Sequence, residues 1–286
     1  MKLEPENYTI KQLKNKLADL EPEAELVEIL RQDSRAGVRD LAAKMSRQIE
    51  KQKQLKNLWQ ERGRIAGELR DHGFKAVCGL DEAGRGALAG PVAAAAVILP
   101  EDCYIAGLDD SKRLKPERRI ELAAEIRVSA RAWAVEMVSS EVIDDIGILP
   151  SVKRAMIGAL ERLAIEPDYL LIDGRISLKE LDTPQRALEK GDGRVNSIAA
   201  ASILAKVMRD AAMKSLDDIY SGYRFAGNMG YGTSHHRRAI EYLGPSRLHR
   251  QSFGGVSRDE AESPKKPKRQ KLPFSDFSAS GQESGR

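Results

Sequence analysis

Two adjacent carboxylates, Asp81 and Glu82, stand just before a glycine-flanked arginine, between two apolar runs of the sequence. Neighbouring side chains of a strand point to opposite faces, so both acids serve one site only where the strand ends or bends. Gly84 and Gly86 can supply that bend. Like charges this close are unfavourable unless a proton or a cation neutralises them. Mg²⁺ or Mn²⁺, which prefer hard oxygen ligands, would do so; the alternative is a solvated turn.

Two further acids favour the metal interpretation. Asp173 closes the apolar run YLLI and precedes a glycine, and the carboxyl end of a buried strand is a common place for site residues in α/β sheets. Asp192 lies between two glycines in KGDGR. Taken alone, each of these acids also fits a surface turn. Asp210, in SILAKVMRD, is the weakest candidate, and a place on a helix surface suits it better.

Four acids without a histidine or cysteine ligand pattern predict a two-metal site for phosphoryl transfer. In such a site one ion activates water and the other stabilises the leaving oxygen. Zinc is disfavoured because the 2 cysteines and 4 histidines show no suitable spacing. His235, His236 and His249 are therefore interpreted as surface or structural residues.

The elements that must position these acids follow from the apolar pattern. Short apolar runs bounded by glycine and proline predict strands at residues 75–80, 90–100, 130–139 and 168–174. Helices are expected at about 150–163 and 197–216, and the small residues of the second would let it pack closely on a sheet. This alternation indicates an α/β fold, although the first two strands are expected to be antiparallel neighbours.

Residues 1–73 are rich in charge and lack good strand candidates. Thr9 and Gln12 are typical of a capping box that opens a helix, and further helices are predicted at about 22–32 and 38–71. The last of these is rich in lysine and arginine. Two interpretations stay open: a solvated helical hairpin that packs on its neighbour, or an accessory domain whose basic face touches nucleic acid.

Composition sets outer limits on function. A net charge of +4 permits a polyanionic partner without requiring one. The N-terminus lacks the layout of a signal peptide, and the most apolar run, Val92–Leu99, is too short to cross a bilayer. We therefore expect a cytoplasmic protein without a membrane partner. Residues 258–286 are rich in proline, serine and lysine, which predicts a disordered tail with a basic stretch at 265–271.

Six segments between Gly79 and Phe253 resemble ribonuclease HII: GLDEAGRGALAGPV, LDDSKRL, YLLIDG, KGDGRVNSIAAASILAKVMRD, GYGTSHH and LHRQSF. The arginine between glycines favours type HII over type HIII, which normally has lysine there. The resemblance implies an α/β, ribonuclease H-like mixed sheet flanked by helices. Residues 74–257 would be the catalytic domain, 1–73 a helical extension found in some bacterial members, and 258–286 the tail.

The resemblance also implies an activity. It implies an endoribonuclease that hydrolyses the RNA strand of RNA–DNA hybrids and cuts 5′ of single ribonucleotides embedded in duplex DNA, as in ribonucleotide excision repair. Cleavage would leave a 3′-OH and a 5′-phosphate, with two Mn²⁺ or Mg²⁺ ions as cofactors. A monomer is expected. The glutamine-to-aromatic spacing in the tail loosely resembles sliding-clamp-binding peptides, against the alternative of a disordered tail without a partner.

Matched position by position, the family's catalytic and metal-binding acids fall on Asp81, Glu82, Asp173 and Asp192, which leaves Asp210 outside the quartet. An intact quartet argues against a non-catalytic hybrid-binding protein of the same fold. The GRG and GYGT segments argue against a resolvase or transposase core.

Seven residues are expected to bind the substrate: Gly84, Arg85, Gly86, Ser111, Lys112, Lys206 and Tyr231. The glycine–arginine–glycine segment would read the ribose 2′-OH, the group that separates RNA from DNA. The tyrosine would stack on the deoxyribose that follows the ribonucleotide, and the serine and the lysines would contact phosphates. Without the resemblance, the lysines would be read as solvated surface residues and the tyrosine equally well as a half-buried loop residue. Two departures, Ala87 for the usual proline and Gly147 for the usual asparagine, remove no proposed ligand.

Overall fold

The computed structural model describes residues 4–18, 20, 22–256 and 279–281. The chain divides into two compact units, Met1–Glu61 and Arg62–Arg286. The division falls inside helix α3 (Ala36–Asp71). Among the described residues, no helix has the length and apolar character needed to span a bilayer.

The first unit is helical, as the sequence predicts. It contains η1 (Pro5–Asn7), α1 (Ile10–Ala18), α2 (Ala24–Arg31) and the first part of α3. The predicted capping box is confirmed: the Thr9 N–H donates to Gln12 Oε1 at 2.9 Å, and the Gln12 N–H donates to Thr9 Oγ1 at 3.3 Å. The helices enclose a small apolar core of Leu13, Leu17, Val27, Leu30, Val38, Ala42 and Met45.

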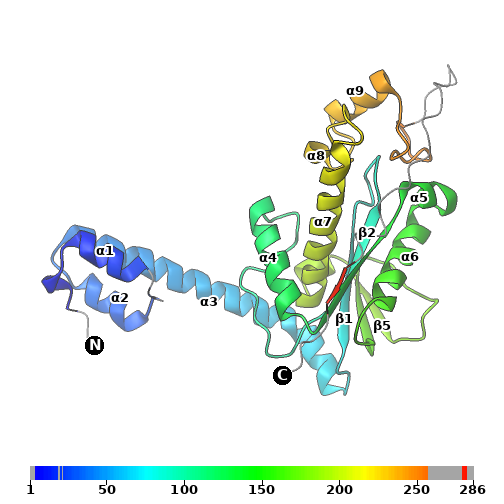
Figure 1. The fold of residues 1–286 in the computed structure, drawn as a ribbon. Coiled ribbons are helices and arrows are strands. Elements are labelled where there is room, and N and C mark those ends of the chain that lie inside the picture. The colour runs from blue at the N-terminus through cyan, green and yellow to red at the C-terminus, as the bar shows by residue number, and fades with distance from the viewer. Residues whose placement is uncertain (1–3, 19, 21, 257–278, 282–286) are drawn as a thin grey trace. The chain divides into compact units, whose positions relative to one another are not determined.

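The second unit is built on a mixed sheet with the strand order β5-β4-β1-β2-β3-β6 (Figure 1). The strands are β1 (Val77–Ala83), β2 (Val92–Ile98), β3 (Ala132–Val138), β4 (Tyr169–Asp173), β5 (Gln185–Leu188) and β6 (Ala279–Gly281). β1 pairs antiparallel with β2 and parallel with β4, and β4 pairs parallel with β5. The antiparallel start and the α/β class are therefore confirmed. β5 was not predicted, because its sequence QRAL carries little apolar signal.

The expected disordered tail falls almost entirely outside the described residues. The exception is β6, which pairs antiparallel with β3. Without β6, β3 would be an edge strand, whose unpaired backbone groups accept a further strand.

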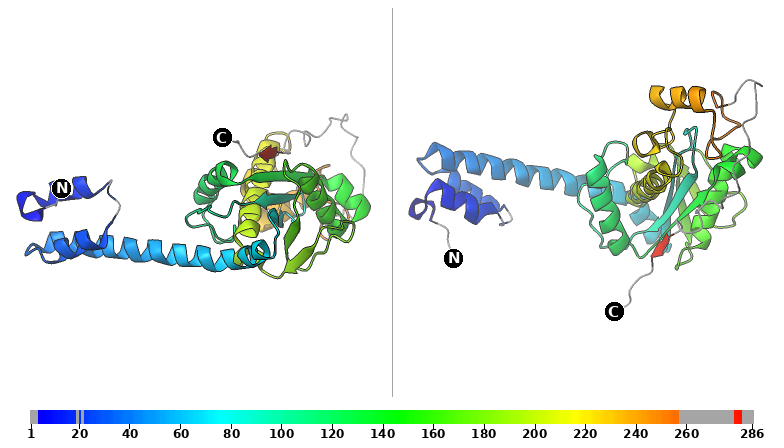
Figure 2. Two further views of the ribbon diagram at one scale, coloured as in Figure 1. Left: turned by 90° about the horizontal axis from the view of Figure 1, so that it is seen from below. Right: turned by 45° about the horizontal axis from the view of Figure 1, so that its top comes forward.

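Helices cover both faces of the sheet (Figures 1 and 2). α7 (Asn196–Asp217) packs on β1 and β2 from one face and is joined there by α4 (Pro116–Ser129), while α6 (Ile148–Glu161) packs from the other face beside α5 (Ser140–Ile146). The short elements η2 (Gly191–Gly193), α8 (Phe225–Asn228) and α9 (Ser234–Leu243) complete the unit. Gly147 ends α5 and precedes α6 at φ 85° and ψ 164°, a conformation open to glycine without strain.

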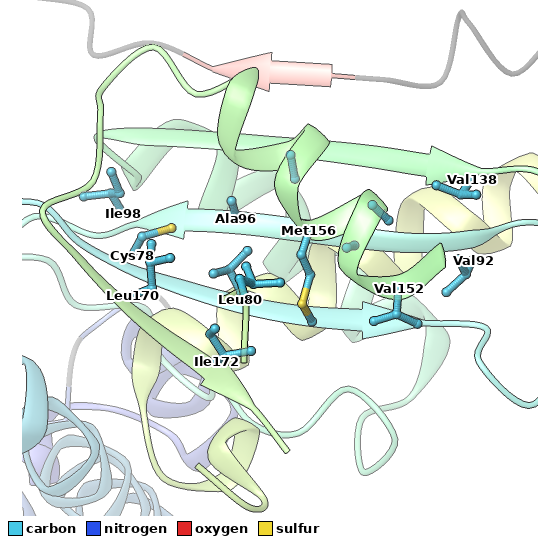
Figure 3. Packing of buried hydrophobic residues seen from close by; sticks show 14 of the residues in the cluster. Cys78, Leu80, Val92, Ala96, Ile98, Val138, Val152, Met156, Leu170 and Ile172 are labelled. Atoms are coloured by element: carbon cyan, nitrogen blue, oxygen red, sulfur yellow. The ribbon is translucent and has the colours of Figure 1, made fainter. Parts of the chain in front are cut away.

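Successive side chains of β1 point to opposite faces of the sheet, so they contact different helices. Cys78 and Leu80 point into the apolar cluster under α6, together with Leu170 and Ile172 of β4 and Met156 of α6 (Figure 3). The odd-numbered positions face α7. Gly79 lies directly against that helix, because a Cβ added there would be 2.2 Å from the carbonyl carbon of Ser197. The backbones of β1 and α7 are therefore in contact, and the position admits only glycine.

We expect Gly79→Ala to destabilise the protein by at least about 1–3 kcal/mol, because an added methyl group must push α7 away from β1. Urea unfolding measures this free energy. Gly254→Ala is the matched control, since a Cβ at Gly254 meets no described atom within 4 Å, and its effect should stay within about 0.5 kcal/mol. Equal stability of the two variants would contradict the close packing at Gly79.

Candidate active site

Three of the predicted acids converge at the carboxyl ends of two parallel strands. Leu80 of β1 pairs with Ile172 of β4, so Asp81 and Asp173, one residue further along each strand, are register neighbours on the face toward α7. Glu82 follows Asp81 near the end of β1. The bend that the sequence predicts begins at Gly84, where φ is +90°.

Asp192 joins them from η2, which follows β5. The Gly191 N–H donates to Asp173 Oδ1 at 2.7 Å and ties this turn to the end of β4. A Cβ at Gly191 would lie 3.3 Å from the same oxygen and 2.7 Å from Ile198 Cδ1. The glycine before Asp192 is thus needed for the close approach of the two acids.

Backbone N–H groups orient the carboxylates without neutralising them. Asp81 Oδ1 accepts from the Glu82 N–H at 2.7 Å, and Asp192 Oδ1 accepts from the Gly193 N–H at 2.9 Å. Burial raises the pKa of Asp81 well above its usual value, and the charges of Glu82 and Asp173 raise it further. Burial and Asp173 likewise raise the pKa of Glu82. The fold therefore holds mutually repelling charges in place.

A further acid, Asp110, was missed by the sequence interpretation. Burial raises the pKa of Asp192, and the neighbouring charge of Asp110 is the next largest cause, ahead of Asp173. Asp110 also accepts a hydrogen bond from the Lys112 N–H at 2.8 Å. It is the second aspartate of LDDSKRL, so its signal was present in a segment read mainly for its serine and lysine.

The donor set fits divalent cations. All four predicted ligands offer hard carboxylate oxygens, and Glu82 Oε2 is buried without a hydrogen-bond partner among the described residues. Within that same part of the chain, no group of three or more acidic, histidine or cysteine side chains is already closed into a metal-ligand cluster.

The loop after β1 is held by two buried arginines. Arg250 donates to the carbonyls of Gly84, Arg85 and Gly90 at 2.8, 2.9 and 3.0 Å. Arg209, on α7, donates to the carbonyls of Pro91, Met229 and Ala89 at 2.8, 2.9 and 3.2 Å.

Neither of these arginines makes an ion pair with a described carboxylate within 4.0 Å. Both guanidinium groups are fully buried. Burial lowers the pKa of Arg209, and burial together with Arg209 lowers the pKa of Arg250 to about 9. Their charge is therefore stabilised chiefly by backbone carbonyls.

The glycines of this loop have different roles. A Cβ at Gly84 would lie 1.9 Å from Arg209 Nε, whereas a Cβ at Gly86 would meet no described atom within 4 Å. Gly84 is thus required by packing, and Gly86 leaves open space at an exposed position. The Ala87 N–H donates to Gly84 O at 3.3 Å, a bond that the family's usual proline could not make.

Tyr231 is anchored through its backbone and its ring. Arg209 and Lys206 lie 5.3 and 5.6 Å from the ring centroid. The Tyr231 carbonyl accepts from His236 Nδ1 at 2.9 Å, and His236 Nε2 lies 3.0 Å from His249 Nε2.

The protonation pattern of this histidine pair follows from its partners. The Ser246 N–H donates to His249 Nδ1 at 2.9 Å, so His249 carries its proton on Nε2 and donates it to His236. His236 then carries its own proton on Nδ1 and donates to Tyr231. Both rings must be neutral for this chain of bonds, so of the two roles that the sequence left open, surface or structural, His236 and His249 have the structural one. His235 is exposed.

The remaining predicted substrate residues differ in exposure. Ser111 is buried, and its hydroxyl pairs with that of Ser202 at 2.9 Å. Lys112 is exposed and faces the acids; burial lowers its pKa, but Asp110, Asp81 and Asp192 outweigh that effect and raise it.

Lys206 is part of an ion-pair cluster on α7. Its ammonium group lies 2.6 Å from Asp210 Oδ1, and Arg119 lies 3.7 Å from the other oxygen of Asp210. Asp210, on α7, therefore pairs with two cations, a role that the sequence interpretation, which expected only a place on a helix surface, did not predict.

Comparison with known proteins identifies relatives over both units. The family model described as Ribonuclease HII matches residues 78–256, and that described as Ribonuclease HII N-terminal domain matches residues 9–69. A curated Ribonuclease HII from Geobacillus thermodenitrificans is 46% identical over 250 residues, which cover 87% of this chain and 96% of the relative.

Solved structures show the same fold. The ribonuclease HII in the PCNA:RNase HII complex from Archaeoglobus fulgidus superposes with a TM-score of 0.53 at 27% identity, over 65% of this chain and 98% of that one. Bst-RNase HIII in complex with Mn²⁺ has a TM-score of 0.50 at 21% identity, over 66% of this chain and 70% of that one.

The histidine pair makes stability depend on pH. Burial, with the neighbouring His236, lowers the pKa of His249 to about 4 from an ordinary 6.5. As the pH falls, His249 is therefore protonated in the unfolded chain before it is protonated in the folded protein. The free energy of unfolding keeps its full contribution from neutral His249 above pH 6.5 and loses it as the pH falls toward 4. The loss is at most about 1.4 kcal/mol per pH unit.

We expect the free energy of unfolding, measured with urea at each pH, to fall more steeply over this window in the wild type than in His249→Gln. The buried carboxylates contribute equally to both proteins, so the difference isolates the histidine. His235→Gln removes an exposed histidine and should follow the wild-type curve. Parallel curves for wild type and His249→Gln would refute the neutral pair.

Proposed function

The chain belongs to the ribonuclease HII family, and we propose that Asp81, Glu82, Asp173 and Asp192 hold the divalent ions of its activity. That activity is the ribonuclease HII activity, EC 3.1.26.4, which is carried out by a metal-dependent nuclease. The observation that carries the assignment is the register of β1 and β4, which brings Asp81 and Asp173 together beside the unpartnered Glu82 Oε2.

Two ions at this position, when bound, supply activation of water and stabilisation of the leaving 3′ oxygen. The carboxylates orient them, because each backbone-capped acid keeps one oxygen free of the N–H that fixes the other. We propose Mn²⁺ or Mg²⁺ as the metal, with cleavage 5′ of the ribonucleotide to leave a 3′-OH and a 5′-phosphate. The Mn²⁺ bound to Bst-RNase HIII supports this choice.

The substrate class is the RNA–DNA hybrid, and we propose duplex DNA with a single ribonucleotide as a second substrate. Recognition of the 2′-OH is assigned to Gly84, Arg85 and Gly86. The carbonyls of Gly84 and Arg85 are occupied by Arg250. Among the described residues the N–H groups of Arg85 and Gly86 donate to no backbone carbonyl, so these two groups can meet the sugar. A hydroxyl can accept from them, and the open space at Gly86 admits the ribose.

Tyr231 is proposed to stack on the deoxyribose after the ribonucleotide, because its ring is braced by two cations and its carbonyl by His236. Lys112 and Lys206 are proposed to contact phosphates. For Ser111, the buried bond to Ser202 supports a role in holding the loop that carries Lys112; its predicted phosphate contact stays a prediction.

The wider organisation of the chain is also a proposal. We propose residues 1–73 as a helical extension, 74–257 as the catalytic domain and 258–286 as a tail; the match of residues 9–69 to the N-terminal domain model supports the first part. The Archaeoglobus fulgidus relative in complex with PCNA supports a sliding clamp as partner. Monomeric state and cytoplasmic location stay predictions.

We expect Asp173→Asn to bind a duplex containing one ribonucleotide but to yield no cleavage product with Mg²⁺ or Mn²⁺, because the neutral amide is a poor partner for a divalent ion. Denaturing gels map the cut, and fluorescence anisotropy measures binding. Glu166→Gln removes an equal charge from an exposed residue before β4, at the other end of that strand, and should keep wild-type cleavage. A fully active Asp173→Asn variant would overturn the assignment.

We expect Tyr231→Ala to lower kcat/KM for a single embedded ribonucleotide by about 10- to 100-fold, taking for the contact with the sugar the value of aromatic stacking on one base, about 1–3 kcal/mol. Long RNA–DNA hybrids should lose less, because they offer many positions for cleavage. Tyr231→Phe keeps the ring and should restore most of the activity. An equal loss on both substrates would speak against a role at the RNA–DNA junction.

A further inference from the structure

A basic groove of about 630 Å³ opens beside the acids, on the segments that follow β4 and β5. We call it the β4–β5 groove. Its charged lining consists of Arg85, Lys153, Arg175, Lys179, Lys190 and Glu189. Five basic side chains therefore face a single carboxylate, a strong local excess of positive charge.

The groove is continuous with the proposed metal site. Gly174, which lines it, directly follows Asp173, and Lys190 stands two residues before Asp192. Arg85 Nη1 lies 3.8 Å from Glu82 Oε1. A polyanion that reaches the acids can thus extend into the groove without leaving the surface.

The positive charge is only weakly compensated. Arg175 pairs with Glu189 at 2.7 Å, but their side chains are 83% and 63% exposed, and such surface pairs contribute little. Lys153 lies 3.5 Å from Glu180. Within the described part of the chain, Lys179 and Lys190 have no carboxylate within 4.0 Å.

A neighbouring hollow shows that this excess is local. It has a volume of about 910 Å³, shares Lys153 with the groove and lies against α6 and β3. Its charged lining is balanced, with three basic and three acidic side chains: Lys153, Arg154, Arg162, Glu136, Glu161 and Glu180. The larger hollow therefore offers no attraction to a polyanion, whereas the smaller groove does.

We propose that the β4–β5 groove binds the phosphate backbone of the substrate duplex beyond the scissile bond. This proposal rests on the proposed function. The site acids repel phosphates, and an adjacent row of cations offsets that repulsion. Long side chains from separate segments suit several phosphates of one backbone, because each cation can follow a different phosphate. Arg175 and Lys179 follow β4, and Lys153 comes from α6, so none of the three belongs to the metal site.

The test is the salt dependence of binding, measured by fluorescence anisotropy in EDTA with a duplex that contains one ribonucleotide. Each phosphate contact contributes about 0.9 to the slope of log K against log salt concentration. We expect the triple variant K153Q/R175Q/K179Q to reduce that slope by about 2 to 3 and to weaken binding at least about 10-fold at 0.1 M salt.

The control variant K75Q/R127Q/R131Q removes the same charge away from the groove: Lys75 and Arg131 precede the starts of β1 and β3, and Arg127 lies in the last turn of α4. Its slope should stay within about 0.5 of the wild-type value. A groove variant whose slope equals that of the wild type, or falls only as far as the control, overturns the proposal and leaves an acidic protein as the partner to consider. Urea unfolding of both variants checks that their stability is unchanged.

Cleavage of the same duplex by the wild-type protein with Mg²⁺ or Mn²⁺ separates this proposal from the proposed function. Wild-type cleavage together with an unchanged slope in the groove variant refutes the groove alone. A wild-type protein that does not cut the ribonucleotide-containing duplex refutes the proposed function, whatever the salt slopes show.

Discussion

The geometry of the loop after β1 depends on two buried guanidinium groups that pair with no carboxylate among the described residues. A buried charge is stable only when its polar atoms are satisfied, and Arg209 and Arg250 meet this demand with backbone carbonyls between Gly84 and Pro91 and with that of Met229. The same hydrogen bonds have two effects: they stabilise the buried guanidinium groups, and they hold the loop after β1 in place. The proposed sugar-reading loop and the approach to Tyr231 are therefore set by one electrostatic constraint.

Helix α7 transmits this constraint to the acids. Ser202, Lys206 and Arg209 recur at helical spacing and so share a face. Ser202 lies beside Asp81 and Ser111, while Lys206 and Arg209 flank the ring of Tyr231. The backbone contact at Gly79 fixes the distance of this helix from β1. A single rigid helix thus sets the spacing between the proposed metal site and the proposed stacking residue.

Charge is segregated across this surface. The carboxyl ends of β1 and β4 bring acids together, and burial, followed by the charges of neighbouring acids, raises the pKa of Asp81 and of Glu82. Segments that leave the same edge of the sheet carry a local excess of positive charge in the β4–β5 groove. Such an arrangement suits a polyanion that must be drawn toward acids, since attraction around the centre compensates for repulsion within it.

The sequence by itself determined most of the strands, the helical first unit and the family, and it predicted the acids of the proposed metal site. These rest on local signals: alternating or continuous apolar runs, glycines beside carboxylates, and the capping box at Thr9. Only the tertiary structure decided the roles of Arg209, Arg250, His236 and His249. An arginine or a histidine in a polar segment reads as a solvated residue, and its burial depends on partners far along the chain, such as Gly84 for Arg250. The tertiary structure also revealed Asp110 beside Asp192 and the cations that meet in the β4–β5 groove, because only folding brings charges from separate segments together.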